Sequence, residues 1–351
     1  MKIVFRLACM AVLLAPTWAH SYPTSSKVSK GCHEDITSLA LRTARLDRPA
    51  AAPLLGTTRD DDALIDDMPF DLEEDMRDLG AASLLTGVRY NDLKGRGPNE
   101  VDRLAQIHGD PKLQQEHCLR APDQDEPNGS DAALVACRGF IREKVQDALE
   151  GLDEAGFPDA ERRIGMDVDL SIRGGVTAQL PRYYARMGEA MHAVQDGFTH
   201  TYRTEAGDKV TAVLNYLEVV EREHEPARDG PAHSSELDRC DGDAPLRARN
   251  RGLATFVTTE LLHITLDTSL GTGAKMLAVD ALLAQYFSFQ AGCTADNGWC
   301  QAPEETLAAA AGCGCSSPGS AGRNASWLGG LTGAFCAAVV LRRRLARRAS
   351  T

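Results

Sequence analysis

Apolar residues recur at helical spacing through most of the middle of the chain, and this period restricts the fold more than any other feature. In residues 130–155, apolar side chains fall three or four positions apart with charges between them. Such a pattern is typical of helices that bury one face. Gly and Pro lie mostly between such runs, and strand-like alternation is scarce. We therefore predict an all-α fold, built as a single multi-helix domain. Four further segments carry the pattern: 182–200, 209–224, 252–270 and 272–289.

The first 19 residues have the composition of a signal peptide. Two basic residues precede a short apolar run over residues 7–15, and Thr17-Trp18-Ala19 has the form of a cleavage site. The run is too short to span a bilayer. We predict that residues 1–19 direct export and that cleavage leaves His20 as the mature N-terminus. An uncleaved anchor is the alternative.

Residues 313–351 form a C-terminal extension of different composition. Cys313-Gly-Cys315 opens a flexible stretch, and an apolar segment from Trp327 to Leu341 precedes a cluster of five arginines. A marginal apolar helix with a basic end inserts with that end in the cytoplasm. This order resembles the MYXO-CTERM sorting tails of myxobacterial surface proteins. The resemblance implies export, temporary membrane retention by a C-terminal sorting machinery, processing near either cysteine, and location at the cell surface or outer envelope. A plain transmembrane anchor is the alternative.

Residues 20–312 remain as the body, and no Gly/Ser/Pro linker divides them, so we expect one domain. The chain has a formal net charge of −12, with 38 basic and 50 acidic residues. Eight of the basic residues and none of the acids lie outside the body, which therefore carries −20. Such a body would repel a polyanion unless bound cations offset its charge locally.

Six cysteines lie in the body, and in an exported protein they are more typical of disulfides than of metal ligands. Cys293 and Cys300 would close a small loop, and Cys118 and Cys137 a larger one, although spacing alone leaves the pairing open. No Cys-x-x-Cys spacing indicates a thiolate zinc site. The six are Cys32, Cys118, Cys137, Cys240, Cys293 and Cys300.

The segment from Met191 to Thr201 carries the clearest ligand pattern. His192 and Asp196 are four residues apart, so a helix places them on one face where both can bind one cation. Imidazole nitrogen and carboxylate oxygen are ligands that suit zinc. A straight helix would carry His200 about 12 Å from His192. Gly197 offers a bend that would bring His200 to a neighbouring metal.

Other residues of ligand type are spread along the body. His33 precedes an apolar helical run, Asp92 follows an apolar stretch, and a loop carries His233 with nearby carboxylates at Glu236 and Asp238. His108 and His117 lie between these segments.

The order of these residues resembles the zinc-dependent phospholipase C family and its relatives, the single-strand-specific fungal nucleases. These proteins are mainly helical and hold three zinc ions in a cleft. The resemblance spans residues 20–240 and is most specific at Met191-His-Ala-Val-Gln-Asp-Gly-Phe-Thr-His-Thr201. The matching positions are His20, His33, Asp92, His117, His192, Asp196, His200, His233 and one of Glu236 or Asp238.

The resemblance implies a role for each position. One zinc would be held by Asp92, His117, His192 and Asp196. Asp196 would bridge to a second, completed by His33 and by the free amine and carbonyl of His20. A third, more open zinc would be held by His200, His233 and Asp238, or by Glu236 in place of Asp238. Asp92 would also act as a catalytic base.

Several positions depart from the family pattern or have rivals. The family starts with Trp where this chain would start with His20. Leu237 occupies the usual position of the last carboxylate, so Glu236 and Asp238 stay open. His263 and Asp267 have the right spacing for the third zinc, but they lie on an apolar helix that favours a core or surface pair. His108 competes with His117, which we favour.

The expected reaction is phosphodiester hydrolysis by metal-activated water. We expect a phospholipase C that acts at a membrane surface, cleaving phospholipid to diacylglycerol and a phosphorylated headgroup. A single-strand-specific nuclease is one alternative, disfavoured by the acidic body, so the leading interpretation includes no nucleic acid. A non-catalytic surface protein with structural zinc is the other.

Overall fold

The computed structural model describes residues 31–300, apart from residues 57, 98, 125–128, 216–224, 226–228 and 230–244. The expected signal peptide and sorting tail therefore lie outside the described residues. The same holds for four expected ligands or their alternatives, which are His20, His233, Glu236 and Asp238. No helix within the described ranges combines the length and apolar character that crossing a bilayer requires.

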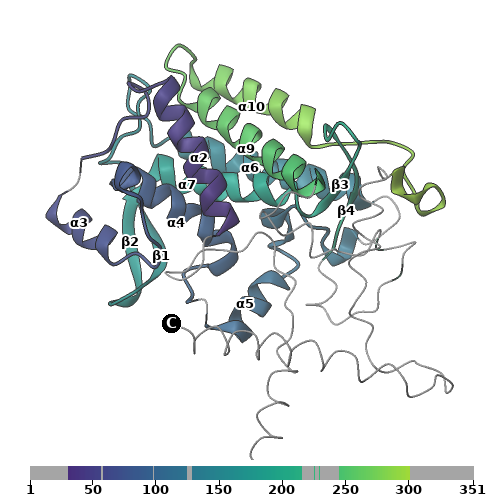
Figure 1. Cartoon of the computed structure of the whole chain (residues 1–351), viewed down its shortest axis with the longest axis horizontal. Helices are drawn as coiled ribbons and strands as arrows, with labels where there is room; N and C mark the ends of the chain where they lie inside the picture. The colour runs from purple at the N-terminus through teal and green to yellow at the C-terminus, as the bar shows by residue number, and fades with distance from the viewer. Residues whose placement is uncertain are drawn as a thin grey trace, which may run out of the picture. The chain divides into compact units, whose positions relative to one another are not determined.

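Eight α-helices make up most of the described structure (Figure 1). Four of the five segments that the apolar spacing predicts to be helical are so, although 182–200 ends early, at Asp196. The helices are α2 (Cys32–Asp47), α3 (Arg59–Asp66), α4 (Leu79–Leu93), α5 (Val101–His108), α6 (Gly129–Leu149), α7 (Arg182–Asp196), α9 (Pro245–Thr265) and α10 (Thr272–Tyr286). Short 3₁₀ turns are η1 (Glu74–Met76), η2 (Gln114–His117), η3 (Pro122–Gln124) and η4 (Ala295–Cys300).

Two small sheets correct the all-α prediction to a mostly helical fold. Strands β1 (Arg163–Leu170) and β2 (Gly174–Pro181) form an antiparallel hairpin. Strand β4 (Lys209–Val213) pairs antiparallel with β3 (Thr201–Arg203) and parallel with β5 (Ser288–Phe289). The expected helix over 209–224 is thus wrong at its start, because residues 209–213 pair with strands distant in sequence.

Helix α7 is the central element of the fold. It packs against α4, α6 and α9, and all its residues except Arg182 and Arg186 are buried. Figure 1 shows α9 and α10 running side by side, with α2 against α9. A helix buried on all sides carries polar residues only where they have partners. The histidine and carboxylate on α7 therefore do not form a surface pair.

Helices α4 and α7 cross closely at two glycines. A Cβ added at Gly87 would lie 2.0 Å from the Ala185 carbonyl oxygen, and one at Gly188 would lie 2.3 Å from the Leu84 carbonyl oxygen. Both positions therefore have room only for a hydrogen atom. The backbones meet directly here, which brings the C-terminal half of α4 against that of α7.

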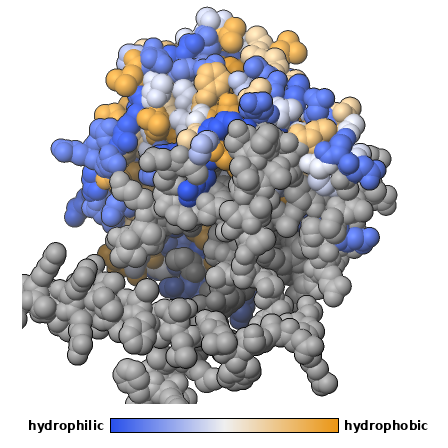
Figure 2. All heavy atoms as spheres, turned by 45° about the vertical axis from the view of Figure 1, so that its right-hand side comes forward, coloured by the Kyte–Doolittle hydropathy of each residue, from blue (hydrophilic) through white to orange (hydrophobic). Residues whose placement is uncertain are grey.

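The surface of the described part is mixed in polarity. On the face drawn in Figure 2, apolar side chains are interspersed among hydrophilic ones wherever residues are coloured. The chemically distinctive group of residues is buried instead, at the C-terminal ends of α4 and α7.

Candidate metal centre

Four side chains from three segments converge in the interior. Asp92, His117, His192 and Asp196 each offer a ligand atom, and these atoms all lie within 4.8 Å of one another. Asp92 is 6% exposed, and the other three are between 0% and 1% exposed. Donors gathered this closely in a protein interior can hold a metal ion, and the structure thus brings together four of the residues predicted from sequence.

The fold dictates how the four meet. Asp92 lies in the last turn of α4, and His192 and Asp196 lie one turn apart on the facing side of α7. The glycine crossing brings these two helices together. His117 ends η2, a single 3₁₀ turn that packs against both α6 and α7. Ligands far apart in sequence are therefore held by elements that are themselves buried.

The Asp196 carboxylate divides its two oxygens between different imidazoles. Oδ2 lies 2.8 Å from His117 Nδ1 and 2.9 Å from His192 Nε2. Oδ1 lies 3.2 Å from His33 Nε2. His33 is fully buried in the first turn of α2 and stacks on His192 with ring centroids 4.2 Å apart. This is the arrangement of a carboxylate that can bridge two cations.

Hydrogen bonds behind the site fix the orientation of several imidazoles. His192 Nδ1 donates to the Val88 carbonyl oxygen at 2.7 Å, which turns Nε2 toward the carboxylates. His33 Nδ1 donates to Gln195 Oε1 at 2.7 Å, and the Gln195 amide donates to Thr37 Oγ1 at 2.8 Å. Such outer partners set the tautomer and raise the basicity of a metal-binding histidine. They are fully buried here, so these rings have little freedom.

His117 is oriented differently. Its Nδ1 faces Asp196 and lies 3.2 Å from His192 Nε2, while its Nε2 is buried without a hydrogen-bond partner in the described structure. His117 Nδ1 and His192 Nε2 thus face each other and the same oxygen of Asp196, and each imidazole nitrogen has a lone pair when it is deprotonated. A cation between them would use these lone pairs.

The electrostatics of the site favour deprotonated Asp92, Asp196 and His117 but a protonated His33. Burial raises a carboxyl pKa, but His192 and the neighbouring imidazoles hold the pKa values of Asp92 and Asp196 below the usual range. Burial lowers the pKa of His117 to about 4, against the effect of its hydrogen bond to Asp196. Burial also acts to lower the pKa of His33, but Asp196 raises it to about 9. A metal at this point would therefore displace a proton from His33.

Only histidines pair with the two buried carboxylates among the described residues. Asp92 faces His108, His117 and His192, and no Lys or Arg of the described ranges lies within ion-pair distance of either acid. Buried carboxylates require compensation by cations or by coordination to a metal. The donor set of imidazoles and carboxylates fits zinc.

His200 reaches the edge of this cluster. Helix α7 ends at Asp196, and the following turn brings His200 Nδ1 to 4.0 Å from Asp196 Oδ2. His200 Nδ1 also donates to the His117 carbonyl oxygen at 2.7 Å, so Nε2 is the atom that would bind a metal. The predicted bend is therefore the end of the helix. Gly197 has an ordinary negative φ of −63° and is required for space, since an added Cβ would lie 2.2 Å from the Phe287 ring.

His108 lies beside the four-residue cluster without being one of its members. Its Nε2 is 3.3 Å from Asp92 Oδ1, its Nδ1 donates to the Leu104 carbonyl oxygen, and its ring centroid is 5.2 Å from that of His117. His108 is 17% exposed, whereas His117 is buried. The structure thus places both rivals near Asp92. His117, the one favoured from the sequence, belongs to the four-residue cluster, and His108 does not.

His263 and Asp267 do not approach this cluster through any described contact. His263 pairs with Asp47 and Glu260, both at 3.3 Å, and Asp267 pairs with Arg48 at 3.2 Å. These contacts join the ends of α2 and α9 at the surface, in agreement with the interpretation of His263 as a core or surface residue.

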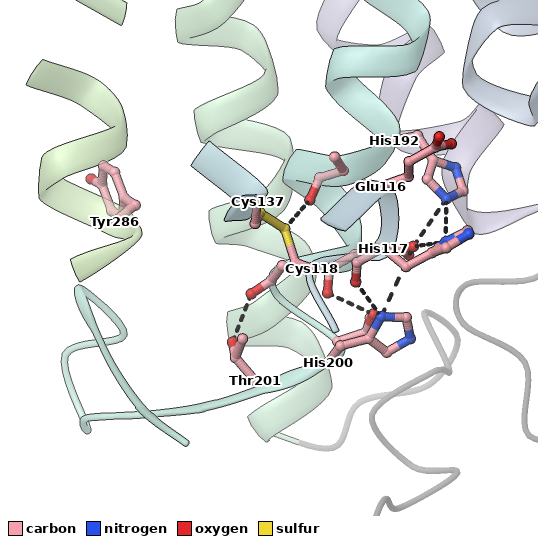
Figure 3. The surroundings of a disulfide bond; sticks show 12 residues. Glu116, His117, Cys118, Cys137, His192, His200, Thr201 and Tyr286 are labelled. Atoms are coloured by element: carbon pink, nitrogen blue, oxygen red, sulfur yellow. Dashed lines mark hydrogen bonds and ion pairs between the residues drawn. A yellow bond between two sulfur atoms is a disulfide. The ribbon is translucent and has the colours of Figure 1, made fainter. Parts of the chain in front are cut away.

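Both disulfides suggested by the spacing are present. Cys118 pairs with Cys137, and Cys293 with Cys300. Cys32 is disulfide-bonded as well. Figure 3 shows that the Cys118–Cys137 bond lies directly beside His117 and His200.

The outer residues Gln195 and Thr37 were not anticipated from sequence. Gln195 is three residues after His192, and Thr37 is four residues after His33, so each lies on the same helix face as a histidine of the site. This helical spacing is the signal that could have found them.

The chain matches no protein-family model, no curated protein and no solved structure. Function is therefore argued from the site itself.

Proposed function

We propose that this protein is an exported zinc-dependent phosphodiester hydrolase, and specifically a phospholipase C that releases diacylglycerol and a phosphorylated headgroup. The observation that supports it most strongly is the Asp196 carboxylate, whose two oxygens face separate sets of imidazoles. A bridging carboxylate is typical of sites with two adjacent metals, and paired metals act on phosphate esters in many hydrolases.

In this proposal the residues would hold up to three zinc ions. Asp92, His117, His192 and Asp196 would hold one zinc, and Asp196 with His33 would hold a second, with His20 as a further ligand. His200 would serve a third site together with His233 and either Asp238 or Glu236. A bound zinc supplies a water of pKa about 7 and positive charge for the phosphoryl oxygens.

The chain's own residues would handle the proton and exclude bulk water. Asp92 is the most exposed member of the cluster, and its Oδ1 faces His108 at the partly exposed edge. In this proposal the Asp92 carboxylate would accept a proton from the attacking water. The nearly complete burial of His192, Asp196 and His33 keeps bulk water from the opposite side of the cluster.

A structural zinc site is the second candidate, and one observation favours it. Four buried protein donors would fill a tetrahedral zinc site, and closed sites of that kind stabilise a fold without catalysis. The two proposals differ in whether a coordination position stays open to water and substrate.

Zinc content and turnover, measured together on the purified exported protein, separate these proposals. Zinc binding with hydrolysis of phosphatidylcholine vesicles supports the phospholipase. Zinc binding with cleavage of single-stranded DNA supports the nuclease, and zinc without turnover of either substrate supports the structural site.

The variant Asp196→Asn tests the bridging role. It removes one anionic oxygen from the middle of the cluster, and we expect zinc affinity and activity to fall roughly 100-fold or more. Asp280→Asn is the control, because Asp280 forms an exposed ion pair with Arg142. Full zinc content and activity in Asp196→Asn would contradict the assignment.

A further inference from the structure

We infer that the Cys118–Cys137 disulfide is a positioning element of the metal centre, so that metal affinity depends on the oxidation of this bond. The inference rests on the proposed metal centre but not on the reaction it carries out. It goes beyond stabilisation of the fold, because it assigns the bond an effect on two particular ligands.

The disulfide holds the segment that carries His117. Cys118 directly follows His117 and has a left-handed backbone conformation, with φ of +48°. Non-glycine residues rarely adopt this region, and they keep it where surrounding structure imposes it. The bond fixes this residue to Cys137 in the middle of α6, and both cysteines are fully buried.

The segment has little regular structure of its own to hold it there. It consists of the single turn η2 followed by an irregular stretch. Asn91 donates to the Glu116 carbonyl oxygen at a long 3.4 Å, and the Arg120 amide donates to the Leu214 carbonyl oxygen at 2.9 Å. Between Glu116 and Arg120, the disulfide links this segment covalently to α6.

Two ligands depend on the position of this segment. The His117 ring contacts Asp196 through Nδ1 at 2.8 Å, and the His117 carbonyl oxygen accepts from His200 Nδ1 at 2.7 Å. Figure 3 shows that His117 and His200 both lie on the side of Cys118 away from Cys137. Cys118 Sγ also lies 3.0 Å from the carbonyl oxygen of Ala193, the residue after His192. A displaced Cys118 would therefore disturb His117 and His200 together.

Because the disulfide positions His117, metal binding would depend on whether the surrounding cellular compartment is oxidising or reducing. Disulfides persist in oxidising surroundings and not in the cytosol. A chain still in a reducing compartment would present a loosely held His117 and would bind zinc weakly. After export and loss of two electrons and two protons to a disulfide oxidant, the same chain would bind zinc tightly.

The test compares two disulfide-deleted variants of the full chain. Cys118→Ala/Cys137→Ala removes the bond beside the site. Cys293→Ala/Cys300→Ala removes the Cys293–Cys300 bond, which makes no described contact with a proposed ligand. Zinc affinity is measured by competition with a chelating dye, and helical content by circular dichroism. We expect the first variant to lose at least about tenfold in zinc affinity and the control to stay within about twofold of the parent protein.

The outcomes separate this inference from the proposed function. A parent protein that binds no zinc overturns the metal centre itself. A parent that binds zinc, with a folded Cys118→Ala/Cys137→Ala variant of equal affinity, overturns only the role of the disulfide.

A second measurement tests the inference if Cys118→Ala/Cys137→Ala does not fold. The zinc-loaded parent protein is treated with a phosphine, which breaks the S–S bond to two thiols and becomes its oxide with oxygen from water. Zinc release is followed against alkylation of each cysteine and against the helical signal. We expect release to follow alkylation of Cys137 while the helices persist. Zinc retained after that alkylation, or released only with loss of helix, overturns the inference.

Discussion

The substitution Gly188→Ala tests how the crossing of α4 and α7 supports the metal centre. The added Cβ would lie 2.3 Å from the Leu84 carbonyl oxygen and 2.6 Å from the Val88 amide nitrogen. Ordinary contacts are near 3.5 Å, so the two helices would have to separate by about 1 Å. A third contact, to the Gly87 Cα, would be 2.7 Å. All three atoms belong to the backbone, which cannot rotate away as a side chain can.

The cost follows from this geometry. Overpacking against a rigid backbone is expected to lower the free energy of unfolding by about 3 kcal/mol, or the melting temperature by roughly 10 °C. The same displacement moves Val88, whose carbonyl oxygen orients His192. Loss of an outer hydrogen bond of this kind lowers metal affinity by about tenfold or more.

The matched control is Gly139→Ala. Gly139 is exposed within α6, and an added Cβ would meet no atom within 4 Å. This change is expected to raise the free energy of unfolding by about 0.5–1 kcal/mol, because alanine loses less conformational entropy in a helix.

Urea unfolding of the metal-free proteins and zinc titration of the folded proteins provide the two readouts. If Gly188→Ala matched Gly139→Ala in stability and in zinc affinity, the reasoning about the crossing would be refuted.

Two further predictions concern the periphery. The Arg163 guanidinium lowers the pKa of Asp61 to about 2, although partial burial acts to raise it. The Asp61 carboxylate therefore stabilises the fold at pH values above its ordinary pKa, and this contribution is lost as the pH falls through 2. In urea unfolding, Asp61→Asn should therefore cost about 1 kcal/mol at pH 7, after allowance for solvent screening, and clearly less at pH 2, where about half of Asp61 is protonated. An equal cost at both pH values would contradict this cause. His263→Gln should leave zinc content unchanged, since His263 pairs with Asp47 and Glu260; loss of one zinc per chain would instead make it a ligand.

The helical framework could be predicted because its signal is local. Apolar spacing located α6, α7, α9 and α10 with ends displaced by several residues. The β1–β2 hairpin was missed although Ile164, Met166, Val168 and Leu170 alternate along β1. Strand β4 gave no comparable signal, because its pairing with β3 and β5 is set by residues distant in sequence.

The residues of the buried cluster could be predicted for a different reason. His192 and Asp196 are linked by the helical period, and the family resemblance supplied Asp92, His117 and His33. The choice between His117 and His108 depends on burial, which spacing does not contain. The hydrogen bond between Gln195 and Thr37 joins residues that are 158 positions apart in the sequence. The need for glycine at 188 follows from a backbone contact that exists only in the folded chain.

The central claim is that the buried side chains around Asp196 hold metal. Anomalous diffraction at the zinc absorption edge, from crystals of the purified protein grown with zinc, tests it directly. The account predicts a peak about 2.0–2.2 Å from donors of Asp92, His117, His192 and Asp196, with a second between Asp196 Oδ1 and His33. Zinc found only at the protein surface, with these four side chains still contacting one another, would contradict it.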